Sequence, residues 1–200
     1  KIVFLILFLC VAFAASDEVQ DYEAVLPTYM QNEPSQSVYD SVTDFLKGYF
    51  MSSEENRHYP LFKQCDTHWK NDKISTKTVC QVGCLMSSMS MGLNGLGKKI
   101  SGSSANPHTL NSWLKTHHGY QGNLFVWGSM SSFGLKYQGK FKDPSKYVND
   151  KHIVVLNVHN GGHWVLATSV SGSTYHVNDP GYSTTTYTKS QVTQGAVYSL

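Results

Sequence analysis

Apolar residues in this chain repeat first with a helical period and then, after residue 120, with patterns typical of strands. Apolar runs of strand length cover residues 153–158 and 163–170, and a shorter run covers 174–177. Ser171-Gly172-Ser173 is a hairpin signal between the last two, and Asp179-Pro180-Gly181 is a turn signal after the third. Because helices precede strands without alternating with them, we predict an α+β fold, with N-terminal helices packed on an antiparallel sheet.

Two helices are expected ahead of these strands. The first begins at or just after Gly83–Cys84 and ends at the glycines that follow residue 91. Asn106 caps the second, which has Pro107 at its first position and is stopped by Gly119. Weaker strand signals lie at 184–188 and 196–199.

The first residues have the layout of a secretory signal peptide. An apolar run over residues 2–14 ends in the small-x-small pattern Ala12-Phe13-Ala14, and the chain turns polar at Ser16. We therefore expect residues 1–15 to be removed, and the protein to be secreted or lumenal (extracellular, or in a compartment of endosomal or lysosomal type). The run is shorter than the roughly 20 apolar residues of a membrane span, so no span is expected after cleavage.

The rest of the chain is expected to form a leader and one domain. Residues 16–56 are a leader with an amphipathic helix near 36–51, which either packs on the core domain or belongs to a removable pro-segment. The domain proper is expected over 57–200, which is long enough to bury a sizeable core. Only 15% of residues are charged, the net charge is +2 and no basic run occurs, so nucleic acid is not an expected partner. The sequence leaves the oligomeric state open.

Three cysteines remain once Cys10 leaves with the signal peptide. An odd thiol in a secreted protein indicates an intermolecular link or a reactive group, and an oxidising compartment pairs two of the three. We favour a disulfide between Cys65 and Cys80, which leaves Cys84 free. The alternative, a Cys80–Cys84 bond that leaves Cys65 unpaired, stays open from the sequence alone.

Cys84 lies where a helix begins, and the unpaired N–H groups there stabilise a thiolate. A nearby imidazole completes the activation of a thiol, and His163 is the best candidate because it opens a strand after the flexible Gly161–Gly162 pair. Asp179 ends the neighbouring strand across the predicted hairpin, where an aspartate fixes the tautomer and orientation of the imidazole. Trp164 is expected to line the site and to shield it from water.

Each of these residues also has a structural interpretation. Cys84 on its own is more typical of a buried core thiol, His163 of a satisfied core histidine, and Asp179 of a turn. His159 and His163 have the i, i+4 spacing of some zinc sites, but the residues between them break any helix. We therefore expect neither a metal nor a cofactor.

Five segments, in order over residues 60–182, resemble motifs of the C39-like peptidase family. They are Gln64-Cys65-Asp66-Thr67-His68-Trp69, the Gly83-Cys84 helix start, Asn106-Pro107-His108-Thr109-Leu110, Gly162-His163-Trp164-Val165, and Asn178-Asp179-Pro180-Gly181. The resemblance implies a papain-like cysteine peptidase fold and a Cys84-His163-Asp179 triad. It also implies that Gln64 helps to form the oxyanion hole. Leu85-Met86 replaces the Gly-Pro that follows the cysteine in many members.

Residues and resemblance together predict a thiol-dependent hydrolase that cleaves peptide or other amide bonds through a thioester. A Cys65–Cys80 bond would staple the Gln64 loop to the helix start. Two alternatives remain open: a catalytically inactive secreted binding or structural domain on the same fold, and a transamidase that uses the same triad.

Overall fold

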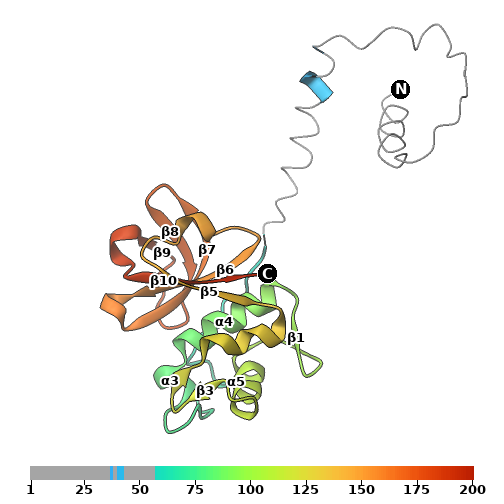
Figure 1. Cartoon of the computed structure of the whole chain (residues 1–200). Helices are drawn as coiled ribbons and strands as arrows, with labels where there is room; N and C mark the ends of the chain where they lie inside the picture. Colours follow the sequence, from blue (N-terminus) through green and yellow to red (C-terminus); the bar gives the residue numbers. More distant parts are fainter. Residues whose placement is uncertain (1–36, 38–39, 43–56) are drawn as a thin grey trace, which may run out of the picture. The chain divides into compact units, whose positions relative to one another are not determined.

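The computed structural model describes residues 37, 40–42 and 57–200, in a chain that divides into two compact units, Lys1–Tyr49 and Phe50–Leu200 (Figure 1). In the first unit, residues 37 and 40–42 are helical. The remainder of the helix expected at 36–51, and the expected signal peptide, lie outside the described residues. None of the helices in the described ranges is long and apolar enough to cross a membrane.

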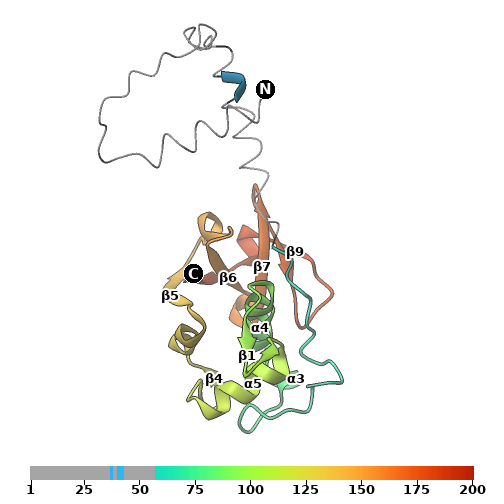
Figure 2. The same ribbon diagram turned by 90° about the vertical axis from the view of Figure 1, so that its right-hand side faces the viewer.

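The second unit contains a six-stranded sheet in which every pair of neighbouring strands is antiparallel (Figures 1 and 2). The spatial order is β5-β10-β6-β7-β8-β9. In chain order the strands are β5 (Lys136–Phe141), β6 (His152–Val158), β7 (His163–Ser171), β8 (Thr174–Asn178), β9 (Thr186–Thr188) and β10 (Gln194–Ser199). The strands predicted at 153–158, 163–170 and 174–177 are confirmed, and the predicted hairpin joins β7 to β8.

Within residues 57–200, three α-helices precede the sheet: α3 (Val79–Val82), α4 (Cys84–Gly95) and α5 (Pro107–Thr116). Helix α4 packs on β6 and β7, and α5 packs on α4 (Figure 2). The predicted cap of α5 is confirmed, since Asn106 and Thr109 form a reciprocal capping box with Pro107 at the first position. The helix ends at Thr116, earlier than the Gly119 stop that we expected.

Strand β6 explains why the region 153–158 is apolar except at Asn157, which is buried and donates to the carbonyl oxygens of Gly161 and His163. Ile153 and Val155 belong to the core between the sheet and the helices, whereas Val154, Leu156 and Val158 belong to a second core on the other face. A strand buried on both faces does not need to alternate apolar and polar residues. The arrangement of helices against an antiparallel sheet is therefore α+β, as predicted.

Several elements were not predicted. Strand β5 (KYQGKF) is an edge strand whose side chains are all at least partly exposed, so its composition is polar and its strand signal is weak. The other elements are short: α3, the two-residue strand pairs β1 (Lys99–Ile100) with β2 (Ser103–Ser104) and β3 (Tyr120–Gln121) with β4 (Leu124–Phe125), and 3₁₀ turns such as η2 (Trp127–Phe133).

Candidate active site

Cys84 is the first residue of α4 and the free cysteine of the described region. Helix α3 ends directly before it, at Gly83, where a Cβ atom would lie 2.5 Å from the carbonyl oxygen of Val79. Only glycine allows the two helices to meet this closely, and their meeting leaves Cys84 half-buried at the start of α4. The first N–H groups of a helix have no intrahelical acceptor, so the sulfur lies at the positive end of the α4 dipole.

His163 and Asp179 lie side by side at one end of the neighbouring strands β7 and β8. His163 is the first residue of β7, and Asp179 directly follows β8. The β7–β8 register pairs Leu166 with Asn178, so Asp179 falls diagonally across from His163 on the same face. Nε2 of His163 is 2.7 Å from Oδ1 of Asp179, and the two side chains are only 8% and 0% exposed. The turn has room for the imidazole because residue 181 is glycine, where a Cβ would lie 2.8 Å from Cε1.

Asp179 is held as a buried carboxylate by four hydrogen-bond donors. Oδ1 accepts from Nε2 of His163, from the backbone N–H of Gly181 at 2.8 Å and from that of Tyr182 at 2.9 Å, while Oδ2 accepts from the Tyr187 hydroxyl at 2.8 Å. Burial raises the pKa of Asp179, but these hydrogen bonds outweigh burial and bring the pKa below its ordinary value. Since an ionised carboxylate only accepts, Nε2 of His163 must carry the hydrogen.

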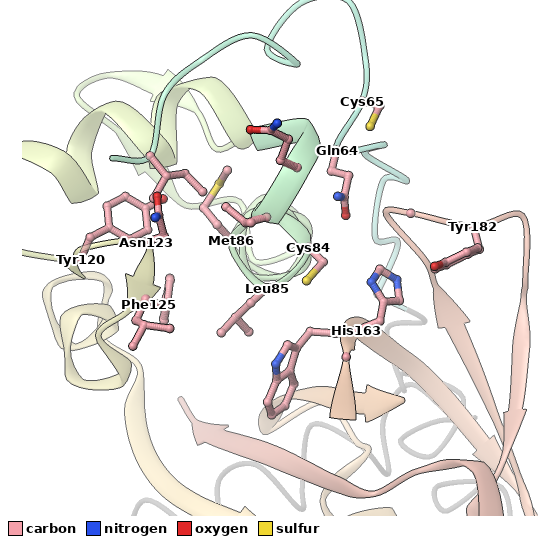
Figure 3. Close-up of a pocket in the computed structure, with 17 residues that line it drawn as sticks. Gln64, Cys65, Cys84, Leu85, Met86, Tyr120, Asn123, Phe125, His163 and Tyr182 are labelled. Carbon is pink, nitrogen blue, oxygen red and sulfur yellow. The ribbon is translucent and has the colours of Figure 1, made fainter. Parts of the chain in front are cut away.

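The other ring nitrogen of His163, Nδ1, is thereby left for the thiol of Cys84. Figure 3 shows the sulfur pointing toward the imidazole across the mouth of the site. Burial lowers the pKa of His163, but hydrogen bonds with Asp179 and with Cys84, together with their charges, raise it to about 9. At neutral pH the imidazole is therefore protonated.

This raised pKa predicts a loss of stability at alkaline pH. The pKa of His163 is about 9 in the folded chain against an ordinary value of 6.5, so the stabilisation is fully present below pH 6.5 and is lost as the pH rises through 9. We expect the urea concentration at the midpoint of unfolding to decrease as the pH rises from 7 to 9.5. The decrease should be smaller in His163→Gln, which has no titrating ring. Equal pH profiles for the two chains would contradict the assignment.

Gln64 reaches the site from the loop that precedes α3. Its Nε2 donates to the carbonyl oxygen of Cys80 at 2.7 Å, and its backbone N–H donates to that of Pro180 at 2.9 Å. Within the described ranges, Oε1 of Gln64 is buried without a hydrogen-bond partner. The amide is thus anchored on the α3 side and lies directly above Cys84 (Figure 3).

A disulfide joins Cys65 to Cys80 and ties the Gln64 loop to α3. Of the two pairings that the sequence allowed, the structure has the one that leaves Cys84 free. Gln64, the residue before Cys65, donates from its side-chain amide to the Cys80 carbonyl oxygen, so the disulfide and this hydrogen bond hold the same two segments together.

Removal of this disulfide is expected to destabilise the domain. The bridge spans a sequence separation of 15 residues, for which loop closure corresponds to about 3 kcal/mol of unfolding free energy. Urea unfolding of the Cys65→Ser/Cys80→Ser double variant, compared with the oxidised wild-type chain, measures this loss. A reductant should lower the wild-type midpoint and leave that of the double variant unchanged; an unchanged wild-type midpoint would contradict the expectation.

The site opens into a cleft of about 580 Å³. One side is polar and carries Gln64, Cys84, His163 and Tyr182, and Trp164 also lines the cleft. The opposite side, here called the apolar wall, is formed by Val82, Leu85, Tyr120, Leu124 and Phe125. Figure 3 shows Tyr120 and Phe125 on the far side of Leu85 from the catalytic candidates.

The apolar wall is attached to the body of the domain by side-chain hydrogen bonds. The Tyr120 hydroxyl donates to Oδ1 of Asn111 at 3.0 Å. Asn123 accepts from the backbone N–H of Lys77 at 3.1 Å and donates to the Thr76 hydroxyl at 2.8 Å. The β3–β4 hairpin, which carries Leu124 outward, therefore has a defined place beside the cleft.

Sequence reasoning missed two residues of the site, Lys63 and Tyr187. Nζ of Lys63 donates to the carbonyl oxygens of Asp179, at 2.8 Å, and Tyr182, and so ties the Gln64 loop to the Asp179 turn. Such a contact joins residues more than a hundred positions apart and leaves no local signal. Tyr187 does carry a weak signal, because it is the single aromatic residue in the strand candidate 184–188.

The described residues contain no group of three or more His, Cys, Asp or Glu side chains that could hold a metal ion. His159 and His163 lie near each other, with ring centroids 5.7 Å apart, but Nε2 of His163 is engaged by Asp179. Nε2 of His159 is 3.0 Å from the hydroxyl oxygen of Tyr187.

Comparison with known proteins yields one structural likeness. No family model matches the chain, and no curated protein matches it significantly. Among solved structures, the chain is similar to a double glycine motif protease from an AMS/PCAT transporter, crystallised in complex with the leader peptide. The match has a TM-score of 0.47 and 14% identity, and it covers 72% of this chain and 92% of the other. Values this low support no inference about activity, which has to come from the site itself.

Proposed function

We propose that this chain is a cysteine hydrolase of papain-like type that cleaves peptide or other amide bonds. The proposal is carried by one observation: a free cysteine at a helix start faces a histidine whose other nitrogen is held by a buried aspartate, in an open cleft. In this arrangement each residue has one role: Cys84 is the nucleophile, His163 the general acid and base, and Asp179 the group that orients His163.

The reaction begins with attack of the Cys84 sulfur on the carbonyl carbon of the substrate. A carbon–sulfur bond forms while the carbonyl oxygen takes up the negative charge. His163 then delivers the proton that it holds to the leaving nitrogen, the carbon–nitrogen bond breaks and the amine departs. Water attacks the resulting thioester and gives a proton to His163; the carbon–sulfur bond breaks, releasing a carboxylic acid and restoring the thiolate–imidazolium pair.

Gln64 is proposed to stabilise the oxyanion together with the backbone N–H of Cys84. A primary amide has two N–H hydrogens, and one from Nε2 goes to the Cys80 carbonyl oxygen, so the amide plane is fixed while the second hydrogen is available. A hydrogen-bond donor to the oxyanion typically increases the rate of the reaction about 10²–10³-fold.

The compartment proposed for this reaction is oxidising, either outside the cell or in a lumen. The Cys65–Cys80 disulfide supports this assignment, since such bonds persist in oxidising compartments and are rare in the cytosol.

The test uses the full chain without reductant, treated with iodoacetamide at pH 6 and in parallel with a complex mixture of tryptic peptides. Mass spectrometry locates the alkylated thiol and any new peptide termini. Alkylation of Cys84 faster than in the urea-unfolded chain, with new termini that are missing for Cys84→Ala, is the expected result. Alkylation no faster than in the unfolded chain, or cleavage that survives Cys84→Ala, would overturn the proposal.

The apolar wall is proposed to receive a bulky apolar side chain of the substrate beside the bond that is cut. Leu124 is 71% exposed, and a leucine with this exposure next to a cleft gains from contact with an apolar ligand. In Leu124→Asp we expect kcat/KM to fall about tenfold for peptides with Leu or Phe near the cleaved bond. Val126→Asp, an exposed apolar residue of the same segment outside the cleft lining, is the control and should stay within twofold. An equal loss of kcat/KM in both variants would contradict the proposal that the apolar wall binds the substrate side chain.

A further inference from the structure

Beyond the triad, the hydrogen bonding of Asp179 continues into the sheet through Tyr187. Tyr187 lies in β9, is buried, and its hydroxyl is 2.8 Å from Oδ2 of Asp179. This oxygen faces away from His163, whose Nε2 contacts Oδ1. The two carboxylate oxygens of Asp179 are therefore held from opposite sides, Oδ1 by His163 and Oδ2 by Tyr187 of β9.

The direction of each hydrogen bond follows from the number of hydrogens available. Tyr187 has one hydroxyl hydrogen, and the Asp179 carboxylate can only accept, so Tyr187 donates to Asp179. Nε2 of His159, 3.0 Å from the same hydroxyl oxygen, must then be the donor to Tyr187. Burial, followed by the hydrogen bond with Asp179, raises the pKa of Tyr187 to about 12, so the hydroxyl keeps its hydrogen throughout the physiological range.

The backbone at His159 adopts a conformation that brings its ring to this position. His159 and Asn160, in the turn η4 (His159–Gly161) between β6 and β7, have φ angles of 51° and 53°. Two successive non-glycine residues in the left-handed region are strained, and such strain persists only where surrounding structure holds it. The ring of His159 lies 4.6 Å from that of Tyr182 and 5.8 Å from that of Tyr187.

We propose that Tyr187 and His159 are positioning residues, which hold Asp179 in the orientation that its bond to His163 requires. This inference rests on the function proposed above. His159 donates to Tyr187, Tyr187 donates to Oδ2 of Asp179, and Oδ1 is left to accept from His163. Without the Tyr187 hydroxyl, Oδ2 would be a buried charged oxygen with no partner among the described side chains, and the carboxylate would turn or admit water to satisfy it.

The domain supplies a matched control for Tyr187. Tyr175 pairs with Tyr187 in the β8–β9 register, is also buried, and also donates to a carboxylate, at 2.9 Å to Oδ1 of Asp143. Asp143 is an exposed carboxylate that also binds Lys189 and is not part of the cleft. Tyr175→Phe and Tyr187→Phe therefore remove the same atom from neighbouring strands, and only the second removal affects the triad.

The measurement is the rate of Cys84 alkylation by iodoacetamide in the full chain from pH 5 to 9, together with the urea midpoint of each variant. A hydrogen bond to a charged group changes an equilibrium constant by a factor of about ten or more. Tyr187→Phe should therefore lower the rate of Cys84 alkylation at pH 6 about tenfold. Tyr175→Phe should leave that rate within twofold, even if both variants lose similar stability.

Substitutions at residue 159 test the outer member of the pair. Asn tolerates the left-handed backbone but is too short to reach Tyr187, whereas the longer Gln can place its amide N–H where Nε2 of His159 lies. We expect His159→Asn to slow alkylation at pH 6 about threefold, consistent with a neutral hydrogen bond, and His159→Gln to restore the wild-type rate.

The outcomes separate this inference from the proposed function. If Cys84 of the wild-type chain reacts no faster than in urea, the proposed function fails, and the positioning role fails with it. If the wild-type chain reacts fast and Tyr187→Phe matches it, or Tyr175→Phe slows it equally, only the positioning role is overturned.

Discussion

Replacement of Cys84 by Ala is expected to lower peptide hydrolysis by about 10⁴-fold or more, because no covalent intermediate can then form. Cys84 is half-buried at the surface of the cleft, so the loss of its sulfur leaves only a small gap and the fold should persist. The measurement is the initial rate on the peptide that the wild-type chain cuts fastest in the tryptic mixture.

Cys84→Ser provides the matched variant for this prediction. Serine keeps the size and hydrogen-bonding capacity of the side chain but ionises far less readily than a thiol beside an imidazole. It should therefore be almost as inactive as the alanine variant, with an unchanged urea midpoint. A serine variant that retained a tenth of the activity would mean that the nucleophile is another group.

Asp179→Asn is expected to lower the rate of hydrolysis by more than about 10²-fold at neutral pH. Oδ1 of Asp179 accepts three N–H groups, so the asparagine oxygen will occupy that position and the tautomer of His163 will be retained. What disappears is the charge, together with the acceptor for the Tyr187 hydroxyl, because the asparagine NH2 takes the place of Oδ2. Burial and the loss of the Asp179 charge then bring the pKa of His163 below its wild-type value of about 9, so that less of the imidazole is protonated at pH 7.

The pH profile identifies the cause of this loss. If charge is responsible, Asp179→Asn should recover part of its alkylation rate as the pH falls toward 6, where the imidazole is protonated again. Asp143→Asn is the control, because Asp143 also accepts from a tyrosine but lies outside the cleft, and its rate should match the wild type. A loss in Asp179→Asn that is equal at all pH values would indicate disrupted geometry instead.

The sequence by itself determined the elements whose signals are local. The start of α4 at Gly83–Cys84, the Asn106 cap and the β7–β8 hairpin depend on hydrogen bonds and side-chain periodicity within a few residues of each other. The hairpin also predicted that His163 and Asp179 would meet, since antiparallel pairing places the start of one strand beside the end of the next. The odd number of cysteines predicted that one of the three stays outside an intramolecular disulfide.

Only the tertiary structure decided which cysteine is free and what surrounds the triad. The Cys65–Cys80 pairing, the Lys63 bonds to the Asp179 turn and the Tyr187 bond to Asp179 are set by how the loops and strands pack. The apolar wall likewise depends on where the β3–β4 hairpin lies relative to α4. Contacts of this kind form between residues that are far apart in the sequence and meet only when the domain packs. The residues next to them in the chain therefore do not predict them. Hydrogen bonds within a helix or hairpin can be predicted from the local sequence, because their partners are close in the chain.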